Sequence, residues 1–219
     1  IQLLMDPAGK LTVAAVAAMP DLQLQQLKSD LSLGFTDDVV WLKVVLSRLN
    51  DSDPVNWYLV LGQTVLKDVR LYKPTPQGGY SEHFGTQPDE VDLREVLHRR
   101  PVFLIQQEDL GEQIYWLRIQ TPTAMNTNIS VIRKDIFLTE TTAESFFWGL
   151  MFGGYLIAII FYVAFWTWTR ESIHKNYIAY ITINFLAAFF TGGWPTQFST
   201  QIPNTIWIGL LGIWIALSI

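Results

Sequence analysis

The stretch from Phe146 to Trp168 reads FFWGLMFGGYLIAIIFYVAFWTW, twenty-three residues without a charge, proline, asparagine or glutamine. At about 1.5 Å of rise per residue, a helix over this stretch is roughly 34 Å long, enough to cross a hydrocarbon core of about 30 Å with some tilt. A helix in the core of a soluble protein rarely runs so far without a polar face. We therefore predict a membrane-spanning helix here.

Charge is distributed very unequally on the two sides of this helix. Residues 1–145 hold 13 of the 15 basic and 19 of the 20 acidic side chains, a net charge of −6, whereas the remaining 74 residues have only Arg170, Glu171 and Lys175. An acidic domain of this kind gives no reason to expect a nucleic-acid partner. We predict a soluble domain over residues 1–140 and the start of a multi-span helical domain over residues 141–219.

Two more spans are expected, over residues 177–194 and 206–219, the last of them cut off by the end of the sequence. The loop 170–176 carries the basic residues of this region, and short loops rich in Lys and Arg stay in the cytoplasm. The acidic domain is therefore predicted to lie outside, which in a bacterium is the periplasm, with the helices in the inner membrane. The chain starts without Met and stops in an apolar run, so we expect a fragment of a longer protein.

Small and polar residues within the spans indicate how the helices pack. Gly149 and Gly153 form a G-x-x-x-G pattern, which allows two helix backbones to approach closely. We expect them to pack against sibling helices of the same chain, and a homodimer seam is the alternative. Asn184 in the second span needs a hydrogen-bond partner in lipid, most simply on another helix.

The soluble part has the pattern of many short strands. Turn-like residues separate them, and no long helical pattern intervenes, which favours an antiparallel sandwich over a parallel α/β fold. We predict an all-β jelly-roll sandwich, with residues 11–27 as a loop with helical turns. The predicted strands cover residues 1–5, 41–49, 56–62, 69–74, 100–107, 113–121 and 128–138.

Alternation within these strands selects a candidate ligand face. In the strand from residue 41, Leu42, Val44 and Leu46 form the apolar set, so Trp41 and Lys43 lie on the other face. In the strand from residue 113, Trp116 and Arg118 likewise lie on the face opposite the apolar set. An aromatic and cationic surface of this kind can stack on sugar rings, although a loop or the membrane-proximal surface is an alternative cover for both tryptophans. The candidate ligand-binding residues are Trp41, Lys43, Trp116, Arg118, Arg70 and Tyr72.

Other chemistry is not indicated. His83 and His98 lie in polar surroundings without a second His or Cys at metal-ligand spacing, so we predict surface histidines and no metal or cofactor. The sequence has no cysteine. Paired catalytic carboxylates, a Ser–His pair and a phosphate-binding glycine loop are not identifiable, and no enzyme activity is expected within these residues.

Several motifs resemble one receptor family. The run GFTDDVVWL over residues 34–42, Trp57, LYKP over residues 71–74 and YWLRIQT over residues 115–121 resemble the type 2 extracellular domain of bacterial seven-transmembrane receptors with diverse intracellular signalling modules (7TMR-DISM). The membrane part is similar to the start of that family's seven-helix domain. The residues that carry this similarity are Gly149, Gly153, Gly154, Tyr155, Arg170, Tyr177 and Tyr180.

The resemblance implies a periplasmic jelly roll similar to carbohydrate-binding modules. It would act as a sensor for a small-molecule or glycan ligand, and its signal would cross the membrane to a diguanylate cyclase, histidine kinase or phosphatase beyond this chain. The alternative is a membrane-tethered binding module or transporter-associated subunit without signalling output. Four more spans and a soluble catalytic domain after Ile219 would distinguish the receptor.

Overall fold

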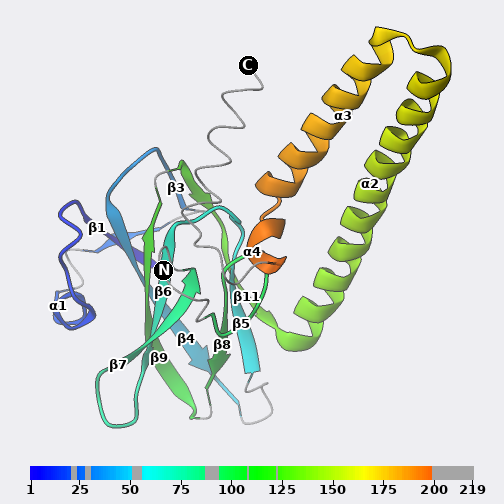
Figure 1. Cartoon of the computed structure of the whole chain (residues 1–219). Helices are drawn as coiled ribbons and strands as arrows, with labels where there is room; N and C mark the ends of the chain where they lie inside the picture. Colours follow the sequence, from blue (N-terminus) through cyan, green and yellow to red (C-terminus); the bar gives the residue numbers. More distant parts are fainter. Residues whose placement is uncertain are drawn as a thin grey trace.

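The computed structural model describes residues 1–20, 24–27, 31–50, 56–86, 94–107, 109–121 and 123–198. A β-sandwich is followed by a pair of long helices (Figure 1). The strands are β1 (Gln2–Asp6), β2 (Gln25–Gln26), β3 (Leu31–Gly34), β4 (Val39–Arg48), β5 (Asn56–Leu61), β6 (Asp68–Pro74), β7 (Tyr80–Thr86), β8 (Val102–Gln106), β9 (Gly111–Gln120), β10 (Met125–Thr127) and β11 (Ile129–Arg133). The helices are α1 (Val13–Ala17), α2 (Lys134–Thr169), α3 (Ser172–Thr191) and α4 (Trp194–Phe198).

The sandwich has two layers of antiparallel strands. One layer is a six-stranded sheet in the order β2-β1-β4-β9-β6-β7, and the other contains the sheets β11-β5-β8 and β10-β3. Alternate side chains of both layers meet in one core, because successive residues of a strand point to opposite faces. Leu42, Leu117 and Leu71 enter it from the first layer, and Leu59 and Phe103 from the second. The predicted β-sandwich is confirmed.

Two strand predictions differ from the structure. The segment around His83, where no strand was predicted, forms β7 at one edge of the six-stranded sheet. The last predicted strand stops at Arg133, and α2 begins at Lys134. A strand would have turned Ile136 and Leu138 inward together, but in the helix both are exposed and Phe137 is buried.

In the described part of the chain, α2 is the one helix long and apolar enough to cross a membrane. It ends at Thr169 and is capped by Arg170, which adopts the left-handed conformation with φ 58°. The antiparallel helix α3 begins five residues before the predicted second span, and polar residues near its start make it less apolar. Its role as a span therefore stays a prediction, and the predicted third span lies outside the described residues.

Aromatic rings, not glycines, join α2 to α3. The ring centroids of Phe152 and Phe185 lie 5.4 Å apart, and those of Tyr162 and Tyr177 lie 5.3 Å apart. Apart from the adjacent residues and the nearby backbone of α2 itself, no described atom lies within 4 Å of the position that a Cβ would take on Gly149 or Gly153. The expected packing of these glycines against a sibling helix is therefore not seen between α2 and α3.

The partner of Asn184 also differs from the prediction. Its side-chain Nδ2 donates a hydrogen bond to the carbonyl oxygen of Tyr180, one turn earlier in the same helix, at 2.8 Å. A carbonyl four residues back lies on the same helix face, so no neighbouring helix is required.

Candidate ligand pocket and its link to the membrane helices

The six predicted ligand residues lie together on one face of β4, β9 and β6. In one row Trp41 pairs with Arg118, which pairs with Arg70. In the adjacent row Lys43 pairs with Trp116, which pairs with Tyr72. This face points away from the sandwich core, as the alternation predicted.

The two tryptophans on this face are nevertheless covered. Trp41 is 1% exposed and Trp116 is 2% exposed, and they form a second apolar cluster with Val16 of α1 and with Leu24. The Trp116 Nε1 donates to the hydroxyl oxygen of Tyr80 at 3.2 Å. The expected exposed platform is therefore not formed, because the segment that contains α1 folds over it. A covering loop was the alternative that the sequence left open.

The two arginines of the predicted face are engaged by carboxylates. Asp68 accepts from the Arg70 Nε at 2.8 Å and from the Arg118 Nη1 at 2.5 Å. Glu82 accepts from the Arg70 Nη1 at 3.1 Å and from the Tyr72 hydroxyl at 2.7 Å. Burial and the Glu82 carboxylate raise the pKa of Tyr72 to about 12. This network ties β6, β7 and β9 together.

Lys43 lies apart from this network, in an open groove on the same sheet face. The groove has a volume of about 590 Å³ and is lined by Ile1, Gln2, Gln26, Lys43, Val45, Glu112 and Ile114. The Lys43 Nζ also lies 6.0 Å from the ring centroid of Trp116. Of the predicted six, Lys43 lines this groove.

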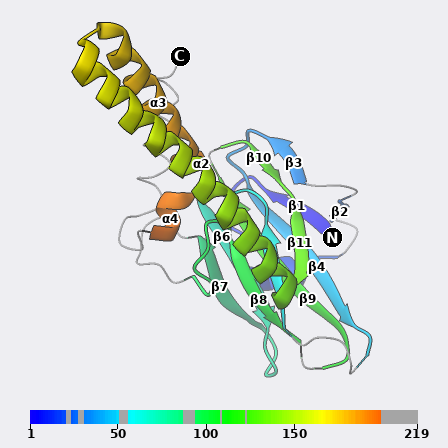
Figure 2. The same ribbon diagram turned by 90° about the vertical axis from the view of Figure 1, so that its right-hand side faces the viewer.

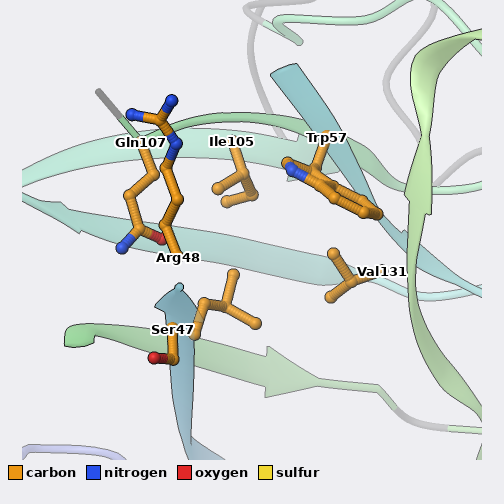
Figure 3. Close-up of a pocket in the computed structure, with 7 residues that line it drawn as sticks. Ser47, Arg48, Trp57, Ile105, Gln107 and Val131 are labelled. Carbon is orange, nitrogen blue, oxygen red and sulfur yellow. The ribbon is translucent and has the colours of Figure 1, made fainter. Parts of the chain in front are cut away.

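A smaller pocket opens between the two layers at the end of β4. Its volume is about 230 Å³, and its lining residues are Leu46, Ser47, Arg48, Trp57, Ile105, Gln107 and Val131. Figure 3 shows Trp57, Ile105 and Val131 around the pocket, with Arg48 and Gln107 on the side opposite Trp57. The Gln107 Nε2 is fixed by a 2.7 Å hydrogen bond to the carbonyl oxygen of Gly111.

Sequence reasoning missed this pocket because its wall is assembled from distant strands. Leu46 belongs to β4, Trp57 to β5, Ile105 to β8 and Val131 to β11. The spacing of residues within one strand does not show which strand ends lie next to one another in the fold. Trp57 of β5 belongs to the family resemblance, and nothing in the sequence around it marks it as a site residue.

One wall of the pocket is continuous with the membrane helix. Val131 lies in β11, which ends at Arg133, and α2 starts at the next residue. The first turns of α2 then lie over the outer face of the sheet β11-β5-β8 (Figure 2). Phe137 is buried there against Tyr58, Val60 and Val102. The start of α2 is thus part of the sandwich.

A second joint lies in the segment before β8. Arg99, 8% exposed, forms an ion pair with Glu144 of α2 and donates from Nη1 to the carbonyl oxygen of Gly192 at 3.1 Å. Its guanidinium lies 5.6 Å from the ring centroid of Trp148 and 5.8 Å from that of Trp194. The neighbouring Arg100 bonds the same carboxylate at 3.1 Å. One loop of the sandwich thereby holds α2 and the turn that follows α3.

His98 belongs to this joint and is not a surface residue as predicted. It is 5% exposed, and its ring meets the ring of Phe137 with centroids 5.2 Å apart. Its Nδ1 accepts from the backbone N–H of Arg100 at 3.1 Å. Burial, together with the charges of Arg100 and Arg99, lowers the pKa of His98 to about 4. The ring is therefore neutral at pH 7, and the sequence could not show this because α2 supplies the cover.

The sandwich continues directly into α2, a helix long and apolar enough to cross a membrane, and this is the arrangement of a domain attached to a membrane. The 7TMR-DISM extracellular 2 family matches residues 1–133, more than half of the chain, and the chain belongs to this family. No curated protein matches the chain. The family assigns the sandwich as the sensory domain of a transmembrane receptor.

Proposed function

We propose that this chain senses a small carbohydrate-like ligand in the periplasm and passes the signal through the inner membrane to a cytoplasmic output module. The module is a diguanylate cyclase, histidine kinase or phosphatase beyond this chain. One observation carries the proposal: the strand that forms a wall of the pocket runs directly into α2.

The pocket lining supports the ligand class. The Trp57 ring and the aliphatic Ile105 and Val131 suit the apolar face of a sugar ring. Ser47, Arg48 and Gln107 supply polar groups for hydroxyls. A volume of about 230 Å³ is below the range of roughly 300–1,000 Å³ for drug-sized ligands, so we propose a ligand of monosaccharide size.

The proposed mechanism is a shift between two pre-existing arrangements of the helices. A ligand can favour one arrangement only by its difference in affinity for the two. Occupancy of the pocket would set the spacing between the end of β4 and β11, and β11 would carry that change into α2. Because Arg99 bonds both Glu144 and Gly192, α2 and the turn after α3 would respond together.

A pocket-filling variant tests the site. Val131→Phe places a ring in the pocket, and Asn56→Phe places the same ring at an exposed position of the neighbouring β5. Calorimetric titration of the chain in nanodiscs with neutral hexoses and hexuronic acids should show a sugar that binds the parent and Asn56→Phe but not Val131→Phe. Equal binding to Val131→Phe excludes this pocket, and a panel without any binder excludes the carbohydrate class.

A further inference from the structure

The turn between β3 and β4 presents an apolar ring to the outside. Phe35 is 84% exposed, the highest value among the large apolar residues that the structure describes. It follows Gly34, whose φ of 68° is in the left-handed region that glycine adopts readily. The backbone N–H of Asp38 donates to the Thr36 Oγ1 at 3.2 Å, which fixes the turn. The ring is thus held outward by a defined turn.

A series of contacts places this turn near the end of α3. Gly34 pairs with Met125 across β3 and β10. The Gln63 side chain then bonds both neighbours of Met125, donating from Nε2 to the carbonyl oxygen of Ala124 at 2.9 Å and accepting from the N–H of Asn126 at 3.1 Å.

The next residue along the chain completes the connection. The Thr64 Oγ1 donates to the carbonyl oxygen of Thr191, the last residue of α3, at 3.0 Å. These three contacts, together with the covalent links Phe35–Gly34 and Gln63–Thr64 of about 3.8 Å each, put the Phe35 turn within roughly 25 Å of the end of α3. Figures 1 and 2 agree, since β3 and β10 lie at the end of the sandwich past which α2 and α3 extend.

This end of the helix pair has the composition of a membrane interface. Trp148 of α2 and Trp194 of α4 both lie against Arg99, and tryptophan is enriched where a helix leaves the hydrocarbon. The apolar run of α2 starts at Phe146. The level of the outer interface therefore passes close to Thr191, at the end of the sandwich where β3 and β10 lie.

We infer that Phe35 inserts its ring into the interfacial region of the outer leaflet. The bilayer is the occupant that the structure favours, because hydrogen bonds connect the Phe35 turn to α3, which packs against the long apolar helix α2. Asp37 and Asp38 follow Phe35 within three residues of the same turn, so the contact would be apolar and would not depend on anionic lipids. It would give the sandwich a further point of attachment, apart from α2 and α3, independent of any ligand.

The absence of cysteine from the sequence allows a direct test. Phe35→Cys and Leu110→Cys each carry a single nitroxide on the full chain in phosphatidylcholine nanodiscs. Leu110 is a matched control, since it is exposed and precedes Gly111, which pairs with Arg48 at the far end of β4, about 30 Å away. Accessibility to oxygen and to a soluble nickel chelate is read from power-saturation EPR.

The label at residue 35 should show nickel accessibility several-fold lower, and oxygen accessibility higher, than the label at residue 110. Equal values at the two positions would overturn the inference. The label at residue 35 could instead be protected and show spin–spin broadening that disappears on dilution with unlabelled chain. This result would assign the contact to a second copy of the chain and would also overturn the inference. Neither outcome bears on ligand binding in the pocket.

Discussion

Arg99 is the residue at which the sandwich and the helices are most closely joined. Removing one partner of a buried ion pair costs about 3–5 kcal/mol, and the partial exposure of the Glu144 side chain, 33%, reduces this figure. We expect Glu144→Gln to lower the free energy of unfolding by about 1–2 kcal/mol in urea titrations of the chain in detergent.

A double-mutant cycle separates this pair from general damage. Arg99→Met replaces the guanidinium with an apolar side chain, and the double variant with Glu144→Gln should lose clearly less stability than the sum of the two single losses. Strictly additive losses would show that the two side chains do not act together.

His98 gives the joint a dependence on pH. Its pKa is about 4 in the folded chain against 6.5 ordinarily, so between these values the unfolded state binds more protons and stability falls as the pH falls. This contribution is complete above pH 6.5, and by pH 5 we expect a loss of about 2 kcal/mol. Urea unfolding at pH 7 and pH 5 should show this loss in the parent and a smaller one in His98→Asn, whose amide oxygen can still accept from Arg100. A loss of equal size in both would assign the effect to other groups.

The covered tryptophans should behave as core residues. Truncating a buried tryptophan costs about 3–5 kcal/mol, whereas an exposed apolar residue costs less than about 0.5 kcal/mol. Trp41→Ala and Trp116→Ala should therefore lower the unfolding midpoint by many degrees, with Leu110→Ala, a change at an exposed residue, close to the parent. Midpoints near the parent value for both tryptophan variants would mean that the segment with α1 does not cover them.

These residues also show what strand alternation can and cannot predict. The face on which Trp41 and Trp116 lie followed from the period of two along their strands, because the core set was uniformly apolar. Their burial depends on Val16 and Leu24, which come from a weakly patterned segment and reach the face only in the folded chain. The cover of His98 by Phe137 was hidden for the same reason.

At the level of elements, the junction of β11 and α2 determines how the sandwich meets the membrane. Residues 128–138 contain apolar side chains that fit a strand or a helix, and a short segment of this kind cannot be assigned by periodicity alone. The change at Lys134 was therefore not predicted. The long apolar run after Phe146 was unambiguous, but it marks only the last two-thirds of α2.

Rigid continuity at this junction can be tested by interrupting it. Two nitroxides, on Glu112→Cys in the sandwich and Glu171→Cys at the tip of the helix pair, report a distance by pulsed EPR. Val131→Phe should shift this distance and Asn56→Phe should not, because only the first fills the pocket wall that continues into α2. Insertion of two glycines after Arg133 should abolish the shift. A shift that survives the insertion would show that another route carries it.

At the level of the whole molecule, the distribution of charge predicted the division into a soluble domain and a membrane part. The spacing of the strands predicted the sandwich. The packing of the helices against the sandwich could not be predicted, because it depends on contacts between residues far apart in the sequence. The bond from Thr64 to Thr191 spans 127 positions, and that from Arg99 to Gly192 spans 93. Polar side chains of this kind have no period that would identify them as partners.

An outward-facing sensory domain requires that the sandwich and the loop 170–176 lie on opposite sides of the membrane. The most direct measurement is the labelling of single-cysteine variants with a membrane-impermeant thiol reagent in cells whose outer membrane has been made permeable. Leu110→Cys in the sandwich should react at once, and Glu171→Cys should react only after the inner membrane is opened. Immediate labelling at residue 171, with protection at residue 110, would contradict the account.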